Sequence, residues 1–434
     1  MSATRRNLLL IGLMGGLGLL AAFWPAFETA WVGLFGAYLG VALFDALAVR
    51  RQRGLRLERQ VPGSLPVGVW HTVQLRLHNT GTVPLDVAVF DHYPVQADLR
   101  GLPRDLRVPR GGWVQCEYGI RPTRRGREHF VGTQVRHRSP LGLWTHNRWL
   151  ESSQEVHVYP DFAAIAHYAL LATDNRLSQI GVRKRPRRGA GMDFHQLREW
   201  RDGDSPQQVD WKATARTRKL ISREYQDERD QEVVFLVDCG RRMLARDGEL
   251  SHFDHSLNAL LLLSYVAMRQ GDSVGVLTFS GNHRWLAPAK GRGLTNRLLN
   301  GLFDLEPGPG NPDYSKAASD LMVRQRKRAL VVLITNLRDE DHADLLPALD
   351  LLRRRHLVVL ASLREQALED AASGPSDDFE SALTLASANE YLAGRESGLR
   401  ALRARGVSCV DVTPQNLPVS LVNRYLDLKA VGRI

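Results

Sequence analysis

Two long apolar stretches open the chain. The first covers residues 7–27 without a charged side chain, and the second covers residues 29–49, where Asp45 is the single charge. Each is close to the ~20 residues that a membrane-spanning helix needs. A proline and a glutamate near their junction predict a tight turn. We therefore expect residues 1–53 to form a transmembrane helical hairpin.

The basic residues around these stretches predict an orientation. Arg5 and Arg6 precede the first span, whereas Arg50, Arg51 and Arg53 follow the second. Because the outer ends are basic and the turn is not, we expect both termini to lie on the cytoplasmic side of the inner membrane. The alternative for the first span is a cleaved signal peptide. Such a peptide has a short apolar core and a small-residue cleavage site, which match poorly here, and a second span follows at once.

Residues 54–160 alternate between apolar and polar positions, as half-buried strands do. The clearest run is "VWHTVQLRLHNTGTVPLDVAVFDHYP", with a turn expected at Asn79-Thr80-Gly81. A second alternating set runs through "WVQCEYGIRPTRRGREHFVGTQVRHRSPLGLW". Short strands with Gly and Pro turns predict a small β-sandwich. His129 and His137 stand alone in these runs, and we interpret both as structural.

From residue 232 onward, short apolar runs alternate with amphipathic helices. This order is typical of a doubly wound α/β sheet, so we expect one such domain over residues 232–434. The chain has no GxGxxG and no GxxxxGK[ST] motif, which leaves a nucleotide site without support. The expected strands are 232–240, 272–280, 283–288, 329–337, 356–363 and 406–413, and the expected helices are 253–270, 295–305, 314–327, 343–355, 366–405 and 416–431.

Composition narrows the class of protein. With 434 residues, 44% of them hydrophobic and 24% charged, the chain is long enough for two or three globular domains. Its net charge of +11 suits contact with an anionic membrane surface or an acidic partner. Cys116, Cys239 and Cys409 lie far apart and form no CxxC pair, so we expect neither a disulfide framework nor a cysteine metal knuckle.

One position of the α/β domain invites a metal hypothesis. Asp238 ends the first strand, and ligands of doubly wound sheets bind at such carboxyl ends. Hydroxyl residues two and four positions later would complete an oxygen cage for Mg²⁺. Those positions hold Gly240 and Arg242, and the neighbouring strand ends in Asn336. We therefore predict a lapsed metal site that binds no cofactor.

The stretch "LREWRDGDSPQQVDWKATAR", residues 197–216, is dense in charge and has three interpretations. A hydrolase would use Asp202, Asp204 and Asp210 around a substrate. No third group orients the nearby His195 and Ser205 as a catalytic pair would require. The nucleic-acid interpretation depends on "VRKRPRRG", residues 182–189, whose basic side chains suit phosphates. No stacking aromatics accompany it, so we favour a basic linker and no nucleic acid.

The third interpretation is a structured joint within residues 161–231. Alternating charges allow a satisfied network of ion pairs, and Asp210 is a plausible N-cap for a short helix. Trp211 would be the buried anchor of that helix, with Arg216 and Asp210 in the same bracket. We favour this bracket, which can also present a docking surface. Its proposed signature residues are Arg198, Arg201, Asp202, Gly203, Asp204, Asp210, Trp211 and Arg216.

These features together carry a resemblance. The string "LREWRDGDSPQQVDWKATARTRKLISREYQDE" (197–228), with "VVFLVD", "ALVVLITNL" and "RPTRRGREHFVGTQVRHRSPLGLW", resembles the bacterial family called domain of unknown function 58. That resemblance implies a von Willebrand factor A-like domain and a MoxR-type AAA+ ATPase as partner, in assembly or chaperone-like work. The metal site of the wider von Willebrand group carries over at Asp238 alone.

The sequence therefore predicts a membrane-anchored, cytoplasmic, non-enzymatic scaffold or adaptor. The alternatives are the hydrolase that would use Asp202, Asp204 and Asp210, and a metal-dependent adhesion module. The client protein, the oligomeric state and the nucleotide state sensed in a partner ATPase stay open at this level. So does the choice between a docking site and a purely structural bracket at residues 197–216.

Overall fold

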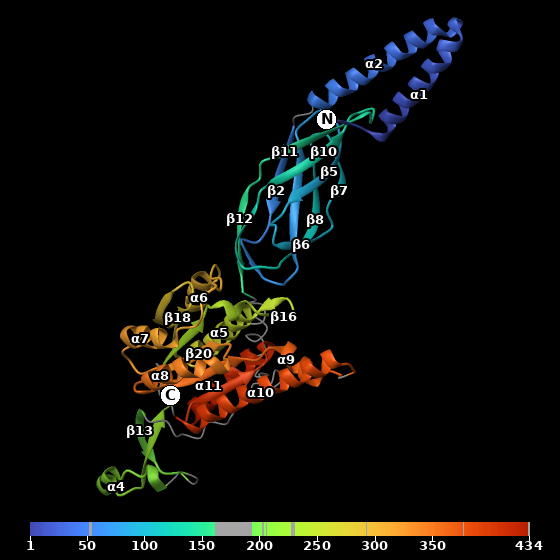
Figure 1. Ribbon diagram of the computed structural model, residues 1–434. Helices are drawn as coiled ribbons and strands as arrows, with labels where there is room; N and C mark the ends of the chain where they lie inside the picture. Colours follow the sequence, from blue (N-terminus) through green and yellow to red (C-terminus); the bar gives the residue numbers. More distant parts are fainter. Residues whose placement is uncertain are drawn as a thin grey trace. The chain divides into compact units, whose positions relative to one another are not determined.

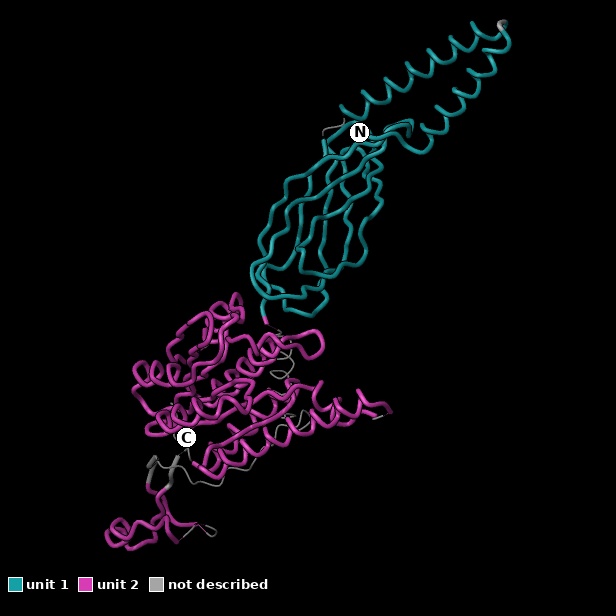
Figure 2. Tube along the Cα trace, in the orientation of Figure 1, with its two compact units in different colours: residues 1–159 teal, residues 160–434 magenta. Residues whose placement is uncertain are grey.

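The computed structural model describes residues 1–51, 54–160, 193–201, 204, 206–226, 231–291, 293–375 and 377–432. It divides into two compact units, Met1–Tyr159 and Pro160–Ile434 (Figure 2). Each unit is described by itself below. The basic segment 182–189, on which the nucleic-acid interpretation depends, lies outside the described residues.

Two apolar helices begin the first unit. Helix α1 spans Arg5–Phe23 and α2 spans Glu28–Arg51, and both are long and apolar enough to cross a membrane (Figure 1). The first helix ends earlier than expected because Trp24 precedes a proline and adopts an extended conformation. Polar contacts join the two helices: the Tyr38 hydroxyl donates to Asn7 Oδ1, and Trp31 Nε1 donates to the Met14 carbonyl at 3.0 Å.

The strands of the first unit, one before the helices and the others after them, form three sheets around one apolar core. The sheets have the orders β1-β11-β10-β5-β7, β2-β4-β8-β6 and β3-β12-β9. Core side chains such as Leu75, Val89 and Val156 come from all three, as expected for a β-sandwich. The strands are β1 Ser2–Ala3, β2 Leu55–Gln60, β3 Ser64–Pro66, β4 His71–Asn79, β5 Leu85–His92, β6 Ala97–Arg100, β7 Arg104–Val108, β8 Trp113–Pro122, β9 Gly126–Phe130, β10 Gly132–Arg138, β11 Trp144–Leu150 and β12 Gln154–Tyr159.

The turn expected after β4 is present, but it connects two different sheets. Asn79 accepts from the Gly81 N–H and donates through Nδ2 to the Val83 carbonyl at 2.8 Å. Strand β4 pairs with β2 and β8, whereas β5 pairs with β7 and β10. The alternating pattern therefore located the strands without revealing their partners.

A carboxylate joins the apolar hairpin to the sandwich. Asp45 of α2 is fully buried and accepts hydrogen bonds from Leu141 N at 2.9 Å, Leu143 N at 3.2 Å and the Ser139 hydroxyl. Trp144 Nε1 donates to the Ala42 carbonyl one turn earlier at 2.8 Å. The last part of α2 is thereby fixed to the turn between β10 and β11.

A second buried charge ties the sheets of the sandwich together. Asp91 of β5 pairs with Arg59 of β2 through Nε at 2.8 Å and Nη2 at 2.5 Å. It also accepts from the hydroxyls of Thr133, at 2.6 Å, and Tyr118. Burial beside this carboxylate raises the pKa of Tyr118 far above that of a free phenol. Because these residues come from four strands, the network crosslinks the two larger sheets.

The second unit contains a six-stranded sheet in the order β19-β18-β15-β20-β21-β22. Numbered along the chain, this is the doubly wound order 3-2-1-4-5-6. Five strands are parallel, and the edge strand β19 runs antiparallel to β18. The strands are β15 Glu232–Asp238, β18 Ser273–Phe279, β19 Trp285–Ala289, β20 Leu330–Thr335, β21 Leu357–Leu363 and β22 Ser408–Val412.

Helices cover both faces of this sheet because the parallel strands are apolar on both sides. Val233, Phe235 and Val237 of β15 pack with α5 and α11, while Val234 and Leu236 pack with α7, α8 and α10 (Figure 1). The helices are α5 His252–Arg269, α6 Leu294–Leu302, α7 Tyr314–Arg324, α8 His342–Arg353, α9 Gln366–Ser373, α10 Phe379–Ala404 and α11 Leu417–Ala430.

The charge-rich segment folds as a hairpin with a short helix in its connection. Strand β13 spans Asp193–Glu199, α4 spans Trp211–Thr217 and β14 spans Ile221–Gln226. The two strands pair with each other and not with the six-stranded sheet. We call residues 193–226 the signature hairpin.

Candidate functional site

The signature hairpin holds its described carboxylates in ion pairs. Arg198 reaches both oxygens of Asp204, at 2.7 and 2.8 Å, and the Arg201 N–H donates to the same carboxylate at 3.0 Å. The hydrogen bonds from Arg198 and from the Arg201 backbone lower the pKa of Asp204. These contacts join Arg198, Arg201 and Asp204, whereas Asp202 and Gly203 lie outside the described part of the chain.

Asp210 is the N-cap of α4, as the sequence predicts. Its Oδ1 accepts from the Ala213 N–H at 2.9 Å, and its Oδ2 pairs with Arg223 Nε at 2.8 Å. The backbone bond from Ala213 and the bond from Arg223 lower the pKa of Asp210. The guanidinium that pairs with Asp210 comes from Arg223 of the adjacent strand, a residue that the sequence-based bracket did not include. Strand alternation could have suggested Arg223, since cross-strand neighbours lie close together.

Trp211 is not a buried anchor, which corrects the sequence-based prediction. The side chain is 69% exposed. The positions of α4 that turn inward are Ala213 and Thr214, and the Thr214 hydroxyl accepts from the Ile221 N–H at 3.0 Å. The helix is held to β14 by the bond from Ile221 to Thr214 and by the pair between Arg223 and its cap Asp210. Trp211 lies on the outer side of the first turn.

The second candidate site lies at the carboxyl edge of the six-stranded sheet. Strands β15 and β20 are neighbours there, at the point where the order of strands reverses, and ligands of open α/β sheets bind at such points. Asp238 is the last residue of β15, and Asn336 follows directly after β20. The sequence thus placed both residues at the right edge.

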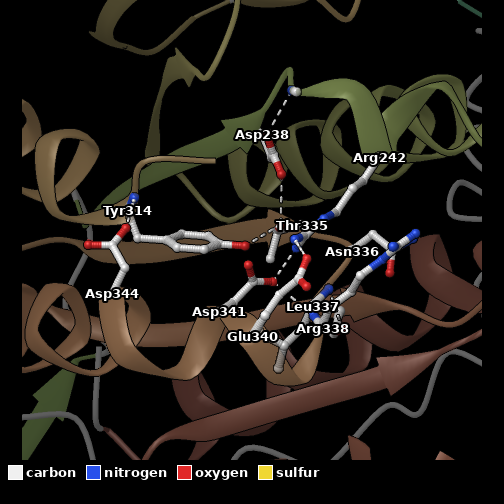
Figure 3. Close-up of polar contacts among 12 residues, drawn as sticks. Asp238, Arg242, Tyr314, Thr335, Asn336, Leu337, Arg338, Glu340, Asp341 and Asp344 are labelled. Carbon is white, nitrogen blue, oxygen red and sulfur yellow. Dashed lines mark hydrogen bonds and ion pairs between the residues drawn. The ribbon is translucent and has the colours of Figure 1, made fainter. Parts of the chain in front are cut away.

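Asp238 is buried, and each of its carboxylate oxygens accepts a hydrogen bond from the protein (Figure 3). Its Oδ1 accepts from the Gly240 N–H at 2.8 Å, and its Oδ2 accepts from the Thr335 hydroxyl at 2.8 Å. The Tyr314 hydroxyl lies 3.0 Å from the Thr335 hydroxyl, which extends the chain of hydrogen bonds. Burial raises the pKa of Asp238, although the bonds from Gly240 and Thr335 oppose that shift.

The donor set around Asp238 does not fit a divalent cation. A Cβ at Gly240 would stand 2.7 Å from the Gly310 carbonyl oxygen and 3.0 Å from Asp238 Oδ1, so a hydroxyl side chain there has no room. The Arg242 guanidinium pairs with Asp341 and Glu340 on the far side of the site (Figure 3). Asn336 donates its amide to Glu365 Oε1 at 2.9 Å. Among described residues, no group of three or more ligating side chains is placed to hold a metal ion.

Several residues of this site were not anticipated from the sequence. Thr335 of β20 donates to Asp238, and Tyr314 of α7 contacts the Thr335 hydroxyl. Asp341 neutralises Arg242 from the turn before α8. The signal for Asp341 was present in the acidic run Asp339–Asp341, one turn after β20. Nothing in the sequence indicated that Thr335 would hydrogen-bond to Asp238, because a threonine in an apolar strand is usually a packing residue.

Comparisons with known proteins add a family match and distant structural likenesses. Residues 196–390 match the family described as "Protein of unknown function DUF58". No curated protein matches the chain. An aerotolerance-related membrane protein from Bacteroides fragilis is 15% identical, with 45% of this chain and 98% of that chain covered and a TM-score of 0.29.

Two alpha-2-macroglobulin structures resemble a smaller part of the chain. The mutant protein from Salmonella is 13% identical with a TM-score of 0.20, and the native protein from Escherichia coli is 12% identical with a TM-score of 0.21. In both cases 24% of this chain is covered. The chain spans only 7% of the solved Salmonella chain and 16% of the solved Escherichia coli chain, which runs from domain MG7 to the C-terminus. These likenesses do not indicate what the chain binds.

Proposed function

We propose that the chain is a membrane-anchored adaptor of the cytoplasmic face of the inner membrane, working with a MoxR-type AAA+ ATPase in assembly or maturation of a client protein. The two apolar helices supply the anchor, and the basic residues at their outer ends favour a cytoplasmic location for both termini. The doubly wound strand order supports a von Willebrand A-like second unit.

The observation that carries the adaptor proposal is the state of the signature carboxylates. A pair of carboxylates that performs acid–base hydrolysis needs one member whose pKa is raised toward neutrality. The pKa values of Asp204 and Asp210 are both lowered by arginine and backbone donors. Both side chains therefore stay ionised and occupied, which favours a structural network that presents a surface over a catalytic pair.

The test is direct binding in a membrane. The full chain is reconstituted in vesicles of zwitterionic and anionic phospholipid, and a purified MoxR-type ATPase is titrated with ATP or ADP present. We expect saturable binding that depends on the nucleotide. Arg201→Glu, a change at an exposed position of the signature hairpin, should weaken binding about tenfold, because a charge reversal at an interface introduces repulsion.

Arg324→Glu is the matched control, since Arg324 is an exposed arginine at the end of α7. It should leave the ATPase affinity unchanged. Absence of binding in both nucleotide states would contradict the adaptor proposal. So would a hydrolytic activity of the parent chain that is lost in Asp204→Asn while the secondary structure stays intact.

A further inference from the structure

Helix α4 presents an apolar and basic face to solvent. Trp211 and Ala215 lie one turn apart on its exposed side, beside a second stripe of Lys212 and Arg216. Leu220, just after the helix, is also exposed. Residues 211–220 contain four basic side chains and no acidic one. We call this face, formed by Trp211, Lys212, Ala215, Arg216, Arg218 and Leu220, the basic tryptophan face.

The acidic groups near this face are already engaged within the hairpin. Asp210 pairs with Arg223, and Glu199 pairs with Lys219 at 2.6 Å. Lys212, Arg216 and Arg218 make no ion pair with any residue that the structure describes. An exposed tryptophan next to uncompensated positive charge is the composition of a binding hot spot for an acidic, partly apolar partner.

The second unit carries a surface of the opposite kind. Residues 366–394 contain six acidic side chains and no lysine or arginine, in a chain whose net charge is +11. At the start of α10, Phe379 is 84% exposed and Leu383, one turn later, is 56% exposed. Asp377 and Glu380 flank this apolar stripe and are exposed too. We call these four residues the acidic tip.

The two surfaces match in charge and in spacing. Each contains a pair of apolar side chains at positions i and i+4 of a helix, flanked by charges of one sign. We propose that the basic tryptophan face of one copy of the chain binds the acidic tip of a second copy. Contact would cover two exposed aromatic side chains and set Lys212 and Arg216 opposite Asp377 and Glu380.

Topology favours a second copy over closure within one chain. Helix α10 leads into β22 at the amino edge of the sheet, and its 26 residues span about 39 Å. Its beginning, with Phe379, therefore lies toward the carboxyl edge and beyond strands of five to seven residues. The signature hairpin precedes β15 in the chain, and β15 begins at the amino edge of the sheet. The chain therefore passes from the hairpin to one edge of the sheet, whereas α10 begins toward the other edge, and this favours a contact between copies.

The contact has two physical consequences. It is heterologous, so repetition produces a head-to-tail row of copies, or a ring if the rotation closes. Two single-turn stripes cover less than the ~1,200 Å² of a stable interface, so the association is weak in dilute solution. Confinement to one membrane raises the effective concentration of the copies. Only this increase in effective concentration rests on the proposed membrane anchor; the contact itself does not.

The experiment pairs two charge reversals in the full chain. Variant one is Lys212→Glu with Arg216→Glu, and variant two is Asp377→Lys with Glu380→Lys. Differently tagged copies are placed in the same vesicles at low protein density, and flotation first verifies that the chains are membrane-bound. Association is measured by energy transfer between labels on the tags. Failure of the flotation step would reject the anchor and not the contact, which is then measured in detergent micelles at higher concentration.

The expected pattern is specific to opposite charges. Parent copies associate, variant one does not associate with itself, variant two does not associate with itself, and the two variants associate with each other. The self-association of each variant should be weaker than that of the parent by at least about tenfold. The control Arg324→Glu with Arg326→Glu, at exposed positions near the end of α7, should behave as the parent does.

Trp211→Ala separates the apolar part of the contact from the charges. It should weaken parent association about tenfold and leave unfolding unchanged, because Trp211 is exposed. Trp113→Ala, at an exposed tryptophan of the sandwich, is its control. Association of variant one with itself at parental strength would overturn the proposal. So would parent copies that do not associate, or a mixture of the two variants that fails to restore the contact.

Discussion

The carboxylate of Asp45, in the second apolar helix, accepts a hydrogen bond from the hydroxyl of Ser139, 94 residues later in the chain. The same carboxylate accepts from the N–H groups of Leu141 and Leu143. A charge near the end of a membrane-spanning segment is costly unless it is paired or hydrogen-bonded. Here three protein donors hydrogen-bond to it, so the second apolar helix and the sandwich meet in a fixed joint.

We expect Asp45→Ala to loosen this joint. The substitution removes the acceptor of the buried Leu143 N–H and of the more exposed Leu141 N–H, and a buried N–H without an acceptor costs about 1–3 kcal/mol. Hydrogen exchange at Leu141 and Leu143 should therefore become much faster, while exchange in β4 stays slow. Asp86→Ala, at an exposed aspartate of β5, is the control. Unchanged exchange at both amides would show that Asp45 does not hold the turn.

The buried pair Arg59–Asp91 leads to a second prediction, for the stability of the sandwich. Asp91→Ala leaves the Arg59 guanidinium buried and uncompensated, which should lower the free energy of unfolding by about 3–5 kcal/mol. The double change Arg59→Met with Asp91→Leu removes both charges and should cost less. Urea titration monitored by hydrogen exchange in β4 and β8 measures the free energy of unfolding of the sandwich in each variant. A loss for Asp91→Ala as small as that for Asp86→Ala would contradict it.

His252 leads to a prediction about pH. Burial lowers its pKa below the usual 6.5, although the charges of Asp247 and Glu365 oppose the shift; Asn336 and Arg395 also face the ring. Below pH 6.5 the unfolded chain binds a proton that the folded chain does not. The second unit should therefore lose stability as the pH falls from 7.5 toward 5.5, by at most about 1.4 kcal/mol per pH unit from this group.

The measurement is the slope of the free energy of unfolding against pH, compared between the parent and each variant. A substitution that only destabilises the fold would lower this free energy at every pH and leave the slope unchanged. His252→Gln should flatten the slope measured by urea unfolding of β15 and β20. His283→Gln, at an exposed position, should not. Equal slopes in His252→Gln and the parent would mean that His252 makes no contribution in this range.

A fourth prediction concerns metal ions at Asp238. Because both carboxylate oxygens accept protein hydrogen bonds and Gly240 has no room for a hydroxyl side chain, we expect no tight binding of Mg²⁺ or Mn²⁺. A ligand at a hundredfold excess over its Kd stabilises the folded state by about 2.7 kcal/mol. No such rise in Tm should occur in the full chain. A rise that disappears in Asp238→Ala would show that the site does bind a cation.

Local sequence patterns predict some features of this protein and miss others. Strands and helices of the second unit were predictable because their apolar runs repeat with clear periods, and Asp210 was recognisable as a cap from its position before "WKATAR". Trp211 was mispredicted because size alone does not say which side of a short helix packs. The sheet assignment of β4 and β5 depends on contacts distant in sequence, which no local pattern encodes.

The most direct test of the account is the topology of the full chain in a bacterial inner membrane. A reporter that is active only outside the inner membrane is fused after Ile434 in one version and inserted after Phe27, in the turn between the apolar helices, in another. The account predicts no activity after Ile434 and strong activity after Phe27, with the chain recovered in the membrane fraction. Activity after Ile434, or recovery of the chain in the soluble fraction, would contradict the claim of a membrane-anchored cytoplasmic adaptor.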